Sequence, residues 1–195
     1  MITLRPADQR GYADHRWLNS HHTFSFAAYH DPRHTGFRNL RVMNEDRVAP
    51  AHGFGTHPHD NMEIVSYVLA GSLEHEDSMG HRQTLTPGEF QRISAGSGIT
   101  HSELNPSPDH PTHFYQVWLR PHTRDIAPSY EQKRFDPTDT HTLPPNRHAW
   151  LQVLRGSVTL NDSPMHAADG ATVTDETQLA ITATRDAELM LFDLN

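Results

Sequence analysis

Short apolar runs alternate with turns containing glycine and proline along most of this chain, and the alternation restricts the fold to the all-β class. The turns include Gly71, Pro87-Gly88 and Gly96-Ser97-Gly98. Predicted strands between the turns cover residues 40–48, 62–69, 73–77, 83–85, 90–93, 99–104 and 113–119. Short strands separated by regular turns are typical of a small antiparallel barrel or jelly roll.

The sequence divides into three regions. Residues 1–125 hold the strands just named and are expected to form an N-terminal domain. Residues 126–147 are rich in proline and polar residues without periodicity, which is typical of a linker. Residues 148–195 return to a β pattern but contain no histidine pair, so we expect a smaller, structural β module there.

Two pairs of potential metal ligands lie on predicted strands of the first region. His57 and His59 are two residues apart, as are His101 and Glu103, and residues at that spacing share one face of a strand. Three imidazoles and one carboxylate on two facing strands form a ligand set for a divalent transition metal with open positions for substrate. We therefore predict a metal site formed by these four residues.

A second carboxylate, Glu63, competes with Glu103 for the fourth position. Glu63 has the parity to share a face with His57 and His59, yet it lies four residues past His59, about 13 Å along a regular strand. Glu103 is one pleat repeat from His101, about 7 Å. We expect Glu103 to be the ligand and Glu63 to lie nearby, in the pocket or behind the ligands.

The chain has 17 histidines, so a single His-x-His pair could arise by chance. Two co-facing pairs, each preceded by a glycine-rich stretch, favour a metal site. His21 and His22 are expected in a loop or at the surface because no carboxylate partner sits at strand spacing from them. A surface position, or one behind the ligands, is also expected for His75, His81, His110 and His113.

The composition and net charge limit the kinds of molecule that this protein can be expected to bind. The 16 lysines and arginines are outnumbered by 24 acidic residues, and the resulting net charge of −8 argues against direct binding to nucleic acid. No apolar run is long enough for a membrane span, and residues 1–6 lack a signal-peptide core. The absence of cysteine excludes disulfides and thiolate metal sites. A cytoplasmic protein is expected.

Several motifs resemble the pirin family of the cupin superfamily, most closely its bacterial members with quercetin dioxygenase activity. The resemblance rests on residues 17–26, His57-Pro58-His59 through Glu63 and Gly71, residues 75–78 and residues 96–103. It implies a bicupin with a metal only in the N-terminal barrel. It also implies that this metal, usually iron, is held by residues matching His57, His59, His101 and Glu103. Because residues 125–147 are shorter than in such proteins, we expect a shortened second cupin.

The ligand set and the resemblance together predict a metal-dependent dioxygenase that cleaves a flavonol such as quercetin with O2, using Fe2+. In this interpretation Glu103 accepts the proton of the substrate hydroxyl. One alternative is a non-enzymatic, redox-sensitive cofactor of transcription that acts through a protein partner. Another is a degenerate cupin that binds metal without chemistry.

Overall fold

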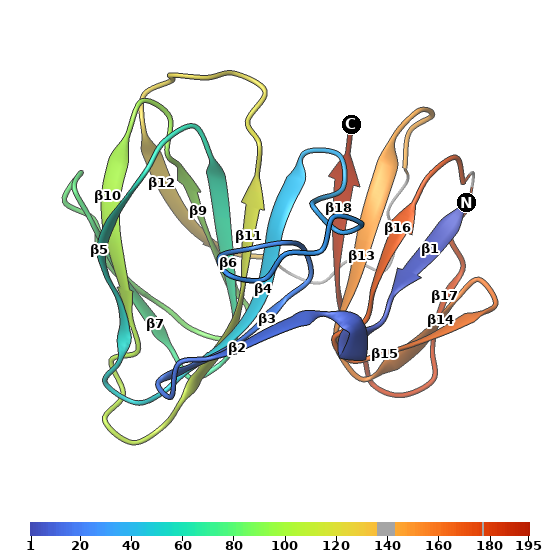
Figure 1. Ribbon diagram of the computed structural model, residues 1–195, viewed down its shortest axis with the longest axis horizontal. Coiled ribbons are helices and arrows are strands. Elements are labelled where there is room, and N and C mark those ends of the chain that lie inside the picture. Colours follow the sequence, from blue (N-terminus) through green and yellow to red (C-terminus); the bar gives the residue numbers. More distant parts are fainter. Residues whose placement is uncertain (136–142, 177) are drawn as a thin grey trace. The chain divides into compact units, whose positions relative to one another are not determined.

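The computed structural model describes residues 1–135, 143–176 and 178–195, and it is built almost entirely of antiparallel strands (Figure 1). Among these described residues the only helix is a single 3-10 turn, η1 (Ala7–Gln9). No helix in the same ranges is long and apolar enough to cross a membrane. The predicted all-β fold is confirmed, and the strands gather into two compact units.

The larger unit, residues 11–36 and 40–137, contains two antiparallel sheets. The first has the order β12-β9-β6-β11-β4-β3-β2 and the second has the order β5-β10-β7-β8. The strands of the first are β2 (Gly11–Asp14), β3 (Leu18–His22), β4 (Leu40–Val48), β6 (Glu63–Ala70), β9 (Glu89–Ser94), β11 (Thr112–Leu119) and β12 (Ser129–Arg134). Those of the second are β5 (Gly53–His59), β7 (Leu73–Asp77), β8 (Arg82–Leu85) and β10 (Ile99–Leu104).

The inner faces of these two sheets meet in an apolar core. Val68 of β6 and Phe114 of β11 pack with Leu73 of β7 and Leu85 of β8, and all four are fully buried. Strand alternation explains this packing, because every second side chain of an antiparallel strand points to the same face. The core fixes the distance between the sheets and therefore positions the polar side chains that also face inward.

The smaller unit comprises residues 1–10, 37–39 and 138–195. It pairs a four-stranded sheet of order β1-β16-β13-β18 with a three-stranded sheet of order β15-β14-β17. Its core includes Leu151 and Val153 from the first sheet and Leu160 and Met165 from the second. The strands are β1 (Ile2–Arg5), β13 (His148–Arg155), β14 (Ser157–Leu160), β15 (Ser163–His166), β16 (Gly170–Val173), β17 (Ile181–Ala183) and β18 (Glu188–Leu194).

The units do not follow the boundaries expected from the sequence at residues 125 and 147. The N-terminal strand β1 pairs along β16, with Ile2 opposite Val173, so the first residues belong to the smaller unit (Figure 1). This pairing covers an edge of β16 that would otherwise be open. Part of the expected linker forms β12, whose Tyr130 lies opposite Ile93 of β9. Another part of that linker, residues 136–142, lies outside the described residues.

Candidate metal centre

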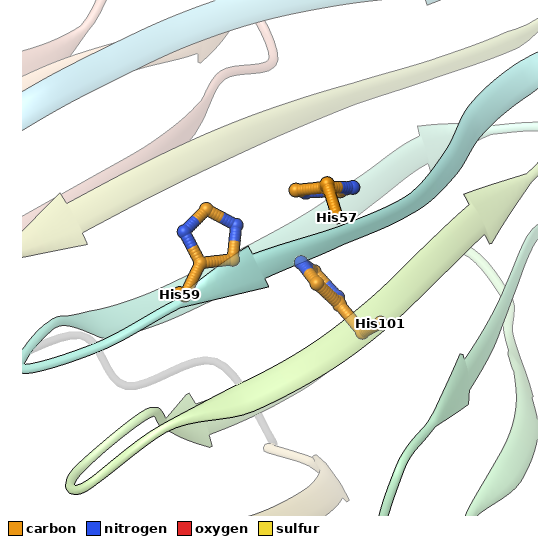
Figure 2. A group of neighbouring side chains, drawn as sticks. All are labelled: His57, His59 and His101. Carbon is orange, nitrogen blue, oxygen red and sulfur yellow. The ribbon is translucent and has the colours of Figure 1, made fainter.

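Strands β5 and β10 bring three histidines together (Figure 2). His57 and His59 project to the same side of β5, and His101 of β10 is the direct register partner of His57. One nitrogen from each ring lies within 4.8 Å of the other two. The ring centroids of His57 and His59 are 4.5 and 4.9 Å from that of His101. Strand parity predicts the common face of His57 and His59, and the register of β5 with β10 adds His101 to the cluster.

The nitrogens of this cluster are suited to metal binding. Buried His101 has no hydrogen-bond partner for Nε2 within the described residues. His57 Nδ1 donates to the Gly55 carbonyl at 2.8 Å, which leaves its Nε2 lone pair available. Burial lowers the pKa of His101 to about 3 and that of His59 to about 4, and repulsion among the histidines adds to the effect. These two rings are therefore neutral near pH 7, the form that binds a divalent metal.

A chain of side chains behind His101 orients its ring. Asp77 Oδ2 accepts a hydrogen bond from His75 Nε2 at 3.0 Å, and His75 Nδ1 faces His101 Nδ1 at 3.5 Å. Because the carboxylate fixes the proton of His75 on Nε2, Nδ1 of His75 is an acceptor for the Nδ1 proton of His101. The lone pair of His101 then lies on Nε2, toward His57 and His59. Desolvation opposes the charge of Asp77, but hydrogen bonds from His75 and His81 outweigh it and hold its pKa below the usual value.

Glu103 is buried next to the histidines but is held by other groups. Its Oε1 accepts from Gln91 Nε2 at 2.7 Å and from the Ser66 hydroxyl at 3.2 Å, and its Oε2 accepts from Gln116 Nε2 at 2.6 Å. A register shift between His101 and Glu103 displaces the carboxylate from the regular pleat. The three-histidine cluster therefore forms without it, and its role as fourth ligand stays a prediction. Burial raises the pKa of Glu103.

Glu63 does not reach the cluster or the cavity beside it. Its Oε2 accepts a hydrogen bond from the Ser94 hydroxyl at 2.6 Å and lies 3.7 Å from a guanidinium nitrogen of Arg92.

The two glycines before His57, Gly53 and Gly55, have unequal roles. A Cβ on Gly53 would clash with the backbone oxygen of Glu103, whereas one on Gly55 would meet nothing within 4 Å. Gly53 thus allows β5 to approach β10 closely.

A cavity of about 580 Å³ opens beside the histidines, within the larger unit. His57, His59 and Glu103 contribute to its wall. Aromatic residues form much of the remainder: Tyr12, Phe26, Tyr29, Phe54 and Trp118. The Trp118 ring meets His59 edge-on, with centroids 4.9 Å apart. The volume lies in the range of sites that bind drug-sized ligands.

The prediction of a loop or surface position was wrong for His22. His22 is the last residue of β3, is 4% exposed and lines the cavity. The polar residues Ser20 and Asn44, with which it interacts, occupy inward positions that a search for apolar faces does not recognise. His75 is fully buried behind His101, one of the two positions expected for it, and His113 binds Glu45 at 2.9 Å.

Three histidines on paired strands inside a double-sheet β fold define a metal-binding cupin. Residues 3–119 match the family model Pirin, and residues 134–194 match the model Quercetinase C-terminal cupin domain. The chain belongs to the pirin family.

Its relatives match over the full length. Quercetin 2,3-dioxygenase of Escherichia coli strain K12 is 42% identical, with 100% of this chain and 99% of the relative covered. A pirin-like protein of Caulobacter vibrioides is 36% identical, with 99% of each covered. The E. coli alignment extends over 228 positions, more than the 195 residues of this chain, so the relative carries residues that this chain lacks.

Solved structures of bacterial relatives have the same fold as this chain. The crystal structure of YhhW from E. coli superposes with a TM-score of 0.96 at 42% identity, covering 100% of this chain and 98% of that chain. A structure of bacterial pirin YhhW in complex with nickel(II) gives a TM-score of 0.94 at 42% identity, with 100% and 99% covered.

Proposed function

We propose that this protein is a metal-dependent dioxygenase that cleaves a flavonol such as quercetin. The observation that carries the proposal is the cluster of three histidines, two of which line an aromatic-walled cavity, beside a buried carboxylate. Relatives named quercetin 2,3-dioxygenase, alignable over the whole chain, support it. The substrates are a planar aromatic molecule and O2.

His57, His59 and His101 would hold the metal, with Glu103 as the fourth ligand. Imidazole and carboxylate groups suit Fe2+, the metal we propose, and also nickel(II), which the E. coli relative holds in its structure. When bound, the metal supplies a Lewis acid that stabilises an anionic substrate oxygen and orients the substrate toward O2.

The side chains of the protein would provide proton transfer and orientation. A carboxylate oxygen of Glu103 accepts the proton of the substrate hydroxyl, leaving an anionic oxygen on the substrate. Burial raises the pKa of Glu103, so it accepts a proton more readily than an exposed carboxylate. The rings of Phe26 and Trp118 meet edge-to-face at 5.4 Å and offer apolar aromatic surface for an aromatic substrate.

Loading the protein separately with Fe2+ and Ni2+ tests the proposal. O2 uptake and loss of quercetin absorbance should occur with metal and should disappear in the metal-free protein and in His101→Ala. A metal-loaded protein that consumes no O2 on quercetin, while a longer pirin relative does so in parallel, would overturn the proposal. That result would favour a redox-sensitive regulator or a degenerate cupin. A cytoplasmic location, and the absence of direct nucleic-acid contact, remain predictions from the sequence.

A further inference from the structure

A row of polar side chains crosses the larger sheet on its inner face. Register pairs His22 of β3 with Asn44 of β4, and Asn44 with Gln116 of β11. Gln116 then pairs with Ser66 of β6, and Ser66 with Gln91 of β9. All five residues are at most 9% exposed. Five neighbouring strands thus place one polar residue each at the same level of a mostly apolar interior.

The two halves of this row have different partners. Ser66, Gln91 and Gln116 all donate hydrogen bonds to the carboxylate of Glu103. These three residues therefore hold the carboxylate of Glu103 in place beside the histidine cluster. The other half, at His22 and Asn44, lines the cavity, as Gln116 also does.

Ser20 and Asp46 extend the cavity-facing half into a cluster of four. The Ser20 hydroxyl donates to Asp46 Oδ1, and His22 Nδ1 lies 3.0 Å from Asn44 Oδ1 and 3.3 Å from Ser20 Oγ. A proton on His22 Nδ1 satisfies both of its neighbours, because each is an acceptor there. The four side chains are 2–4% exposed, and all line the cavity.

Two polar atoms of this cluster have no hydrogen-bond partner in the part of the chain that the structure describes. They are Asp46 Oδ2, an acceptor, and Asn44 Nδ2, a donor. Each belongs to a residue that is only 2% exposed and lines the cavity. Because both residues line the cavity, these two atoms are available to pair with a polar group of a molecule inside it. A hydroxyl group can satisfy both, since it donates to the carboxylate and accepts from the amide.

A continuous aromatic wall connects this cluster to the metal centre. His59 meets Trp118 at 4.9 Å, Trp118 meets Phe26 at 5.4 Å, and Phe26 meets His22 at 5.3 Å between ring centroids. Tyr29 stacks near His22 at 6.3 Å. A planar ligand lying along this wall would have one end at the histidines and the other at the polar cluster.

We propose that Ser20, His22, Asn44 and Asp46 form a binding subsite for ring hydroxyls of the substrate that are remote from the metal. The proposal rests on the flavonol dioxygenase function and deepens it. It assigns the substrate to polyhydroxylated flavonols, for which the two ends of the cavity recognise different oxygens. Unsubstituted flavonols would bind through the metal end alone.

Anaerobic binding to the metal-loaded full chain tests the subsite. Dissociation constants are measured for quercetin and for 3-hydroxyflavone, which keeps the hydroxyl and carbonyl next to each other but lacks the remote hydroxyls. Wild-type protein should bind quercetin more tightly. Asp46→Asn should weaken quercetin binding about tenfold or more and change 3-hydroxyflavone binding by less than about threefold. Asp109→Asn, the same chemical change at an exposed loop position, should alter neither.

Ser20→Ala provides a second, milder variant that removes the hydroxyl donating to Asp46. It should weaken quercetin binding about threefold with little effect on 3-hydroxyflavone. Equal losses for both flavonols in both variants, with metal content unchanged, would overturn the subsite while leaving the flavonol activity intact. Failure of the wild-type protein to bind either flavonol would overturn both the subsite and the proposed function.

Discussion

Asp77→Asn is expected to weaken metal binding although Asp77 is not one of the clustered histidines. Asp77 Oδ1 accepts hydrogen bonds from the backbone N–H groups of Met79 at 2.9 Å and His81 at 3.1 Å. Its Oδ2 accepts a hydrogen bond from His75 Nε2 at 3.0 Å. An asparagine that keeps the two backbone hydrogen bonds must place its amide nitrogen against His75. His75 Nε2 then becomes an acceptor and its proton moves to Nδ1.

The reversed tautomer propagates to the metal ligand. With a proton on His75 Nδ1, the facing Nδ1 of His101 becomes the acceptor and the proton of His101 moves to Nε2. That nitrogen is the one directed at the other two histidines, so metal binding must first undo the arrangement. Loss of an outer partner of this kind costs about 10- to 100-fold in metal affinity, or about 1.4–2.7 kcal/mol.

Competition with a chelator measures the effect. Dissociation constants for Ni2+ should rise about 10- to 100-fold in Asp77→Asn. Glu76→Gln removes the neighbouring, exposed carboxylate of the same strand and should stay close to wild type, which separates the tautomer effect from a loss of charge. Nitrogen-15 NMR of the metal-free protein should show His101 protonated on Nδ1 in wild type and on Nε2 in Asp77→Asn. Wild-type metal affinity in Asp77→Asn, or an Nε2 proton on His101 in wild type, would refute the reasoning.

Three further outcomes are expected. Metal analysis should show that His101→Ala loses most bound metal while Glu63→Gln retains it, because Glu63 is bound to Ser94 and Arg92; metal loss in Glu63→Gln would reverse the carboxylate assignment. The stability of the metal-free protein should depend on pH through His101 and His59, and in the opposite sense through Asp46. The pKa values of His101 and His59 fall from 6.5 to about 3 and about 4, so the unfolded chain binds more protons and stability drops as pH falls from 6.5 to 4. Burial raises the pKa of Asp46 from 3.8 to about 7, so that group acts the other way, and urea unfolding should show a steeper acid loss in Asp46→Asn than in wild type. Gly11→Ala should displace Tyr29, whose ring carbons occupy the space that the added methyl group needs, and should lower the free energy of unfolding by about 1–3 kcal/mol, whereas Gly55→Ala should not.

Strand parity was sufficient to place His57 and His59 on one face because the signals it uses are local. The two-residue spacing of His57 and His59 fixes their common face, and each strand is bounded by recognisable turns. The alignment of His101 with His57 could not be read from the sequence, since register between β5 and β10 depends on contacts between segments far apart in the chain. The same limit explains the unexpected pairing of β1 with β16.

Hydropathy also misreads β12. Residues 129–134 are polar and partly exposed, which is the composition of a linker as well as of an edge strand. Only the free edge of β9 distinguishes the two cases, and that edge exists only after the sheet has formed. Polar edge strands are therefore easily taken for linkers in a single sequence.

The polar row is the hardest feature to foresee, yet its signal is present in the sequence. Ser66 lies between Ile64 and Val68 on one face of β6, as Gln116 lies between Phe114 and Trp118 on one face of β11. A single polar residue at an inward position of an apolar strand is costly unless it has a partner. Such residues on neighbouring strands must therefore partner one another or a common group, and Glu103 is that group for half of the row. In the half that Glu103 does not reach, His22 and Asn44 partner one another, and the amide nitrogen of Asn44 is left for a molecule in the cavity.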